Sequence, residues 1–214
     1  MPRLLAISDR GSLAAPFPDW VAGLAAAGVD GVQLREKALD DRELLALART
    51  ARALLPPPAA LLLNGRLDVA LAAGADGVHL PAGGLPAAPL LAWAARLGRR
   101  PLVGRSTHTL AEVAAARDEG ANYVVFGPVF ATPGKGPPVG TEALAAAARL
   151  GVPVLALGGV EPERVGAAIA AGAHGVAAIR AFRTPAGAAA MAAALAAVLG
   201  AARSPVDSAG APGW

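Results

Sequence analysis

Cysteine is absent from all 214 residues of the chain. Its absence excludes a disulfide framework, a thiol nucleophile and a thiolate metal site. Aromatic residues make up only 4% of the chain, and the 19 lysines and arginines are scattered along it. A nucleic-acid-binding protein needs a clustered basic stripe and aromatic side chains for stacking, so the sequence predicts no nucleic-acid partner. Isolated basic residues and a net charge of +3 are better suited to a small anionic ligand.

Long apolar runs are also missing. A membrane span needs about 18 apolar residues, and the only stretch that approaches this, the Ala-rich residues 186–202, has the small side chains of a packed helix. The first residues, MPRLLAISD, contain no apolar segment typical of a signal peptide. The sequence therefore predicts a cytoplasmic protein that crosses no membrane.

Short apolar strands alternate with Ala/Leu-rich helical segments along the chain. In the clearest unit a strand ends at Asn64, and a helix follows from about Arg66. Gly74 ends this helix, since glycine adopts the left-handed C-cap conformation. Eight such strand–helix repeats are expected, with strands at 4–7, 29–34, 61–63, 77–80, 101–104, 122–126, 153–157 and 175–179.

Eight repeats in roughly 200 residues favour an α/β fold, a closed (β/α)₈ TIM barrel with a single domain over residues 1–202. The alternative is an open, doubly wound sheet. When such a sheet binds a dinucleotide, it usually carries GxGxxG after its first strand, and this chain has SDRGS there. Residues 203–214 are predicted to be a disordered tail.

Local signals mark where several helices should begin. Asp19, Asp40 and Thr109 are good N-cap residues, because their side chains accept hydrogen bonds from the first free N–H groups of a helix. Two further helices are expected to begin at Leu90 and Thr141.

Polar residues gather at the end of the second strand. In a barrel of parallel strands the active site lies at the mouth formed by the loops that follow the strands. Gln33, Arg35 and Lys37 follow one another at every second position at such a strand end, so their side chains are expected to point to the same side. Two cations and an amide suit a phosphate or a pyrophosphate. The alternative is a solvated loop in which Arg35 pairs with Glu36.

The loops after strands six to eight carry further anion-binding signals. Gly158 and Gly159 precede a helix N-terminus, where free N–H groups bind anions, although a plain capping turn has the same sequence. Arg180 follows the eighth strand and adds positive charge. Thr132 and Lys135 lie in a Gly/Pro-rich loop long enough to act as a lid, and the alternative role of the lysine is solubility.

The three histidines are scattered, and with no cysteine they argue against a zinc site. His174 precedes the eighth strand, at the opposite end of the barrel from the mouth, so it is expected to be structural. His79 and His108 lie near strand ends. The first is either functional or a hydrogen-bonded core histidine, and the second is either functional or a polar residue at a helix entry.

The chain contains the segments VQLREK, LLLNGRLDVALAAGADGVHLP, GRSTHT, YVVFGPVFATPGKG, PVLALGG and GVAAIRAF. Together they resemble the thiamine phosphate synthase / TenI family, in order, from residue 4 to about residue 182. The resemblance implies a (β/α)₈ barrel that acts in thiamin biosynthesis. The synthase branch joins a hydroxymethylpyrimidine diphosphate to a thiazole phosphate with Mg²⁺ and releases pyrophosphate. The TenI branch includes a thiazole tautomerase that aromatises a thiazole carboxylate phosphate.

The resemblance also implies which residues hold each substrate. The pyrimidine diphosphate would be held by Gln33, Arg35, Lys37, Asn64, Ser106, Thr132 and Lys135. The thiazole phosphate would be held by backbone N–H groups at Gly158, Gly159 and Ile179. The predicted phosphate-binding set is completed by three arginines at strand ends, Arg66, Arg105 and Arg180.

Two positions depart from the synthase pattern. Gly65 replaces the acid of an Asn-Asp pair, and the segment around Gly84 lacks a second acid. Because Mg²⁺ prefers carboxylate and phosphate oxygens, the absence of both acids favours the TenI branch. The sequence therefore predicts a metal-independent isomerase, a thiazole tautomerase without a metal site or cofactor.

A further departure concerns the group that moves the proton. The histidine that follows Phe-Gly in the TenI pattern is replaced here by Pro128, which leaves His108, His79 and Glu36 as candidate catalytic residues.

Two alternatives stay open: a thiamine phosphate synthase that uses Mg²⁺, and a non-catalytic protein that binds thiazole phosphate, a function that Pro128 supports. The expected partner in each case is a small-molecule thiazole phosphate. The sequence leaves open whether the Ala-rich helices pack against a second copy in a homo-oligomer.

Overall fold

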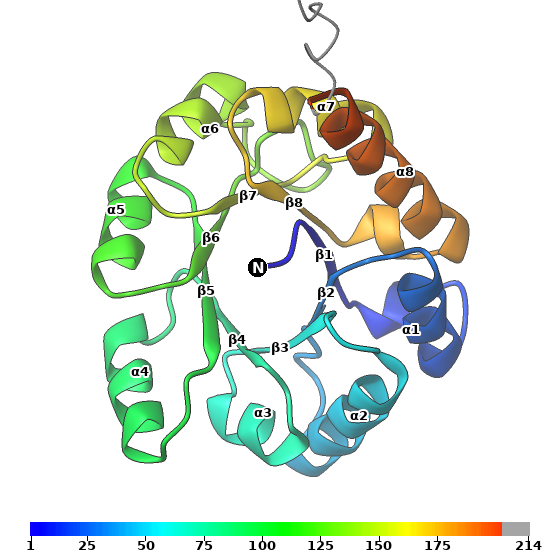
Figure 1. Ribbon diagram of the computed structural model, residues 1–214, viewed down its shortest axis with the longest axis vertical. Helices are drawn as coiled ribbons and strands as arrows, with labels where there is room; N and C mark the ends of the chain where they lie inside the picture. Colours follow the sequence, from blue (N-terminus) through cyan, green and yellow to red (C-terminus); the bar gives the residue numbers. More distant parts are fainter. Residues whose placement is uncertain (203–214) are drawn as a thin grey trace, which may run out of the picture.

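Strands and helices alternate along residues 1–202, the part of the chain that the computed structural model describes (Figure 1). The strands are β1 (Leu4–Ile7), β2 (Gly31–Leu34), β3 (Ala60–Asn64), β4 (Gly77–Leu80), β5 (Leu102–Thr107), β6 (Tyr123–Phe126), β7 (Val154–Leu157) and β8 (Gly175–Ala178). The helices are α1 (Phe17–Ala26), α2 (Asp41–Leu54), α3 (Leu67–Ala73), α4 (Ala87–Arg96), α5 (Leu110–Asp118), α6 (Gly140–Ala148), α7 (Pro162–Ala170) and α8 (Pro185–Ala202). Short 3₁₀ helices, η1 (Arg10–Ser12) and η2 (Arg180–Phe182), follow β1 and β8.

The eight strands close into one parallel barrel in chain order. Leu5 of β1 is paired with Gly31 of β2 on one side and with Ala177 of β8 on the other. The structure thus confirms the predicted (β/α)₈ barrel in a single domain. The predicted tail, residues 203–214, lies outside the described residues.

Apolar side chains fill two separate layers. The larger layer lies between the strands and the surrounding helices, which explains why the strands are apolar on both faces. The smaller layer fills the inside of the barrel with Leu5, Ile7, Leu62, Tyr123, Val125, Leu155 and Ala177. Nearer the mouth the inward-facing residues become polar, and these polar side chains form the candidate site.

Hydrogen bonds join the first and the last repeat of the barrel. The indole Nε1 of Trp20, on α1, donates a hydrogen bond of 2.6 Å to the carbonyl oxygen of Phe182, in η2. At the opposite end of the barrel, Arg3 donates to the carbonyl of His174 at 3.1 Å. Helix α8 packs on both α7 and α1, which completes the outer ring (Figure 1).

Two of the three predicted N-caps are confirmed. Asp40 accepts a hydrogen bond from the amide of Glu43, and Thr109 forms the same kind of capping box with Glu112. The prediction for Asp19 is wrong, because α1 already begins at Phe17, directly after Pro16, and Asp19 lies within its first turn.

Two other helices begin earlier than predicted. Helix α4 begins at Ala87 instead of Leu90, because Pro89 fits the first turn, where its missing N–H group leaves nothing unsatisfied. The carboxylate of Glu119 accepts the free N–H of Ala87 at 3.0 Å. Helix α6 begins at Gly140, one residue before Thr141.

Within residues 1–202, no helix has both the length and the apolar character that crossing a membrane requires. The Ala-rich α8 instead buries Ala188, Met191 and Leu195 against the barrel. The predicted cytoplasmic location stays a prediction.

Candidate active site

The carboxyl ends of all eight strands open on one mouth of the barrel, because every strand pair is parallel. The strand register brings Gln33 beside Ile7, Asn64 beside His79, and Ser106 beside Val125. These four polar residues, predicted from separate strand ends, therefore lie on neighbouring strands β2 to β5. The structure brings together the inward-facing part of the predicted site.

A row of hydrogen bonds joins β4, β5 and β6. It is formed by His79, Ser106 and Tyr123, which we call the polar row. His79 is 2% exposed; its Nδ1 lies 3.0 Å from the hydroxyl of Tyr123, and its Nε2 lies 2.9 Å from the Oγ of Ser106. Gly104 makes room for the tyrosine ring, since a Cβ there would lie 2.0 Å from Tyr123 Cζ. The row is thus fixed by packing as well as by hydrogen bonds.

Burial keeps the polar row uncharged. Desolvation lowers the pKa of His79 to about 3 and raises the pKa of the Tyr123 hydroxyl. Both ring nitrogens of His79 are already hydrogen-bonded, and its ring is neutral near pH 7. His79 therefore fits a role in orienting a neutral ligand better than the predicted role of proton carrier.

A stability measurement tests this burial. The unfolded imidazole titrates near pH 6.5, whereas the folded ring stays neutral to about pH 3. As the pH falls below 6.5, the unfolded state binds the extra proton and stability is lost. Between pH 7.5 and pH 5 we expect the free energy of unfolding to fall by about 2 kcal/mol through this group. Urea denaturation at both pH values measures the loss.

The variant His79→Gln should lack this part of the pH dependence, and His108→Gln, which leaves His79 in place, should retain it. An equal loss of stability in the wild type and in His79→Gln would contradict the assignment.

Beside the polar row, an amide pair leaves one acceptor free. The Nε2 of Gln33 donates to Oδ1 of Asn64 at 3.1 Å. Gln33 is 1% exposed, and its Oε1 has no hydrogen-bond partner among the described residues. A buried polar atom without a partner is costly unless a ligand supplies one. This acceptor is therefore free to accept from an N–H group of a ligand.

The loop after β2 is held in place by a buried serine. The Oγ of Ser8 donates to the carboxylate of Glu36 at 2.5 Å and accepts from the amide of Arg35 at 3.0 Å. The same carboxylate also accepts from the amide of Arg10. Glu36 thus positions the loop that carries Arg35 and Lys37, and its oxygens are engaged. This arrangement argues against the predicted role of Glu36 as proton carrier.

A cavity of about 260 Å³ opens between the loops after β6, β7 and β8. Its lining contains all the site residues predicted in these loops, together with His108 from the end of β5: Thr132, Lys135, Gly158, Gly159, Ile179 and Arg180. The Nδ1 of His108 lies 2.6 Å from the carbonyl oxygen of Gly127, so this ring is anchored to the loop after β6.

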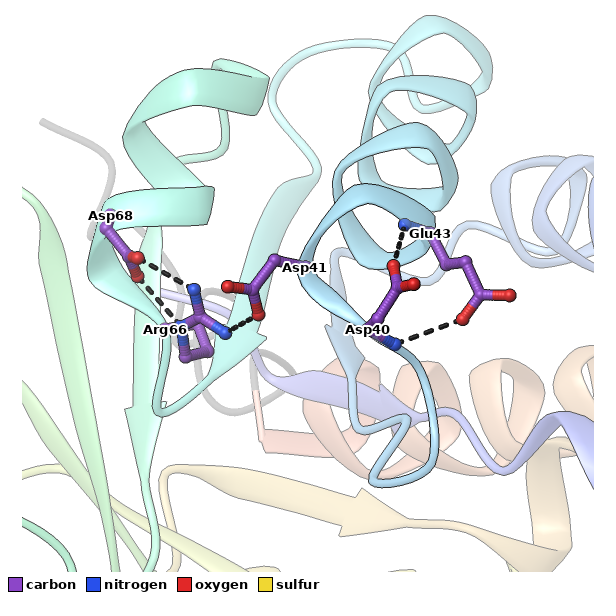
Figure 2. A network of polar contacts seen from close by, with 5 residues as sticks. All are labelled: Asp40, Asp41, Glu43, Arg66 and Asp68. Atoms are coloured by element: carbon purple, nitrogen blue, oxygen red, sulfur yellow. Dashed lines mark hydrogen bonds and ion pairs between the residues drawn. The ribbon is translucent and has the colours of Figure 1, made fainter.

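Two predicted phosphate ligands are used elsewhere. Arg66 forms ion pairs with Asp41 and Asp68 on the outside of the barrel, and these lower the pKa of both carboxyl groups (Figure 2). Arg105 donates to the carbonyls of Ala82 and Leu85 at 3.0 and 2.6 Å, which pins the loop after β4. With their donors engaged, both arginines serve the scaffold.

The remaining predicted cations are free of ion pairs. Arg35, Lys37, Lys135 and Arg180 form no ion pair with any residue of 1–202. They come from the loops after β2, β6 and β8, and so they surround the mouth. Such unpaired cations at a concave mouth attract anionic ligands.

The mouth does not fit a metal ion held by the protein. Residues 1–202 contain no group of three or more His, Cys, Asp and Glu side chains placed to bind one. Gly65 and Gly84 supply no carboxylate, and the nearby Glu36 is engaged by Ser8. Within residues 1–202 the mouth therefore lacks the cluster of carboxylates that would hold Mg²⁺ without oxygens from a ligand.

Sequence reasoning missed three residues of the site. Tyr123 is the only tyrosine in the chain and lies on an apolar strand, a signal that a phenolic hydroxyl there needs a buried partner. Asp9 and Arg183 both line the cavity, and Nη2 of Arg183 lies 3.9 Å from Oδ2 of Asp9. Nothing in the sequence pattern places these two side by side, because they come from opposite ends of the chain.

Comparisons with known proteins identify the family and agree with the fold. The family model described as thiamine monophosphate synthase matches residues 4–182. A thiamine-phosphate synthase of Moorella thermoacetica is 41% identical over 173 residues, which cover 78% of this chain and 80% of the relative. The thiamine-phosphate synthase of Methanoculleus marisnigri is 44% identical over 164 residues, 73% of this chain and 75% of the relative. Among solved structures, a thiamine phosphate pyrophosphorylase from Pyrococcus furiosus superimposes with a TM-score of 0.83 at 28% identity, covering 92% of this chain and 96% of that one.

These relatives overturn the predicted isomerase. Proteins that are 41% and 44% identical to this chain are named thiamine-phosphate synthases, so the prediction of a thiazole tautomerase as the main activity is wrong. The findings support the transferase that the sequence left as an alternative. The absence of acids at Gly65 and Gly84 carried too much weight in that choice.

Proposed function

Because the chain belongs to the thiamine monophosphate synthase family, we propose that it is a thiamine-phosphate synthase, a transferase that acts on two small anionic molecules. One substrate is a hydroxymethylpyrimidine diphosphate and the other is a thiazole phosphate. In the reaction a bond forms between the thiazole ring nitrogen and the pyrimidine methylene carbon. The bond from that carbon to the diphosphate oxygen breaks, and pyrophosphate leaves.

A single observation carries the proposal. The uncharged polar row and the Gln33–Asn64 amide pair lie at the same mouth as four cations. These cations have no ion-pair partner within residues 1–202. A neutral heteroaromatic ring that bears a diphosphate matches this combination, because the ring needs directional hydrogen bonds and the diphosphate needs positive charge.

In this proposal the pyrimidine ring binds over the Gln33–Asn64 amide pair and the polar row. The free Oε1 of Gln33 accepts from the exocyclic amino group of the ring, and Asn64 holds Gln33 in this orientation. Ser106 is oriented by His79, which is itself held by Tyr123. Each of these side chains is uncharged near neutral pH, which suits a neutral pyrimidine.

The diphosphate is placed among Arg35, Lys37, Lys135 and Thr132. The three cations of this set stabilise the charge that builds up on the leaving oxygen. No step is assigned to a metal ion, because the residues present do not fit one.

The thiazole phosphate is placed in the cavity beside Gly158 and Gly159. Neither glycine amide donates a hydrogen bond to a backbone carbonyl within residues 1–202, and Arg180 lines the same cavity. Free N–H groups just before α7 are suited to an anion. Thr132 and Lys135 line this cavity as well, so the two substrates meet under one loop.

The test is a direct assay with the full chain. The purified protein is incubated with the pyrimidine diphosphate and the thiazole phosphate, with and without added Mg²⁺. Thiamine phosphate is followed by chromatography, and released pyrophosphate by a coupled enzyme assay. We expect both products in equal amounts. Absence of thiamine phosphate under both conditions would overturn the proposal.

A further inference from the structure

The loop after β6 and the turn after β7 form one packed unit. The amides of Val129 and Phe130 donate to the carbonyls of Leu157 and Gly158 at 2.8 and 3.0 Å, so the loop after β6 is hydrogen-bonded to the end of β7 and to the turn that follows it. Contact is so close that a Cβ on Gly158 would lie 2.5 Å from the Cβ of Pro128. The loop that carries Thr132 and Lys135 therefore rests directly on the Gly158–Gly159 turn.

One arginine contacts both parts of this unit from outside the cavity. Arg164, in the first turn of α7, donates from its guanidinium to the carbonyl of Gly159 at 2.8 Å. The same guanidinium lies 5.4 Å from the centroid of the Phe130 ring, within the range of a cation–π contact. Arg164 does not line the cavity, and it forms no ion pair within residues 1–202.

These contacts fix the direction of the turn's free amides. In a planar trans peptide the N–H group points away from the carbonyl of the preceding residue. Phe130 holds the Gly158 carbonyl and Arg164 holds the Gly159 carbonyl, so the N–H groups of Gly159 and Val160 are turned to the opposite sides of those two peptides. Neither N–H donates to a backbone carbonyl within residues 1–202, and Val160 is buried at the cavity wall.

We infer that Arg164 is a positioning residue that sets the anion-binding turn and ties it to the loop carrying Thr132 and Lys135. Its bond to Gly159 orients the turn toward one phosphate, and its contact with Phe130 holds the loop that serves the other. Binding of the two anions is thereby coupled through one side chain. The assignment of the two phosphates rests on the proposed function, whereas the tie between turn and loop does not.

Three variants separate the two contacts. Arg164→Ala removes both, and we expect the KM for each substrate to rise about tenfold with kcat changed less than about threefold. Phe130→Leu keeps the bond to Gly159 and should raise the KM for the pyrimidine diphosphate alone. Arg149→Ala, at the exposed C-cap residue of α6, whose side chain forms no hydrogen bond within residues 1–202, is the matched control and should behave as wild type.

A second measurement does not depend on turnover. Hydrogen exchange of the Val129 and Phe130 amides should be about tenfold faster in Arg164→Ala than in the wild type, and calorimetry should show about tenfold weaker binding of inorganic phosphate. If the wild type makes no thiamine phosphate but these differences appear, the proposed function fails and the inference stands. Arg164→Ala matching Arg149→Ala in exchange and in phosphate binding would overturn the inference, as would a wild type that binds no phosphate.

Discussion

Replacing Arg35 by alanine is expected to reduce kcat/KM for thiamine phosphate formation by about 100- to 1,000-fold. The planar guanidinium presents paired donors to a diphosphate, and no ion pair within residues 1–202 competes for them. The backbone amide of Arg35 is fixed by Ser8, so the truncation removes the charge and leaves the loop in place. Steady-state kinetics with varied pyrimidine diphosphate measures the effect.

Two companion variants show whether the loss of activity comes from the missing positive charge or from the missing paired N–H donors. Arg35→Lys keeps the charge but loses the paired donors, so its kcat/KM should fall between the wild type and the alanine variant. Arg42→Ala removes an exposed arginine from α2 and should leave kinetics and stability unchanged. If kcat/KM of Arg35→Ala stayed within threefold of the wild type, the diphosphate would have to bind elsewhere.

Gly158→Ala is expected to abolish measurable binding of the thiazole phosphate and to lower the free energy of unfolding by about 2–4 kcal/mol. The φ angle of Gly158 is +94°, which disfavours any residue with a Cβ. The added methyl group would also lie 2.5 Å from Pro128 and would push the loop after β6 off the turn. Calorimetry with thiazole phosphate and urea denaturation measure the two effects.

A matched glycine separates backbone strain from damage to the site. Gly172 has the same φ of +94° but lies between α7 and β8, at the far end of the barrel, where an added Cβ would meet only Ala148 at 3.1 Å. Gly172→Ala should therefore lose about 1–2 kcal/mol of stability while it binds the thiazole phosphate normally. Normal binding by Gly158→Ala would instead place the phosphate away from this turn.

The sequence predicted the parts of the fold that depend on local chemistry. The alternation of short apolar strands with helices favoured a barrel over an open sheet, and the predicted N-caps Asp40 and Thr109 were confirmed. Gly74 adopts the left-handed C-cap conformation at φ +68°. The family resemblance is also confirmed, because its motifs lie within residues 4–182, the span of the family match.

What the sequence did not reveal depends on which elements become neighbours. The guanidinium of Arg66 could bind a phosphate, but it forms an ion pair with Asp41 of the neighbouring helix α2 instead (Figure 2). Tyr123 reaches His79 across 44 positions because β5 between them carries glycine at residue 104. Such pairings follow from barrel closure and register, which no local pattern encodes.

The error over the reaction has a similar cause. The prediction of an isomerase rested on the missing carboxylates at Gly65 and Gly84. Their absence was taken to mean that the protein cannot release pyrophosphate. The structure shows that positive charge reaches the mouth from the loops after β2, β6 and β8. Under the proposed function these cations together stabilise the leaving anion, and the sequence had already placed each of them at a strand end.

Closure of the barrel also depends on the order in which the strands are synthesised. Strand β1 emerges first from the ribosome, but one of its two partners is β8, and the bond from Trp20 to Phe182 spans 162 positions. Until β8 emerges, the edge of β1 stays open to other chains, and contacts of such long range form slowly. An interrupted chain that lacks only its last repeat would therefore be prone to aggregation and would lack Arg180, the cation that follows β8. Completion of the candidate site therefore waits until β8 and Arg180 have been synthesised.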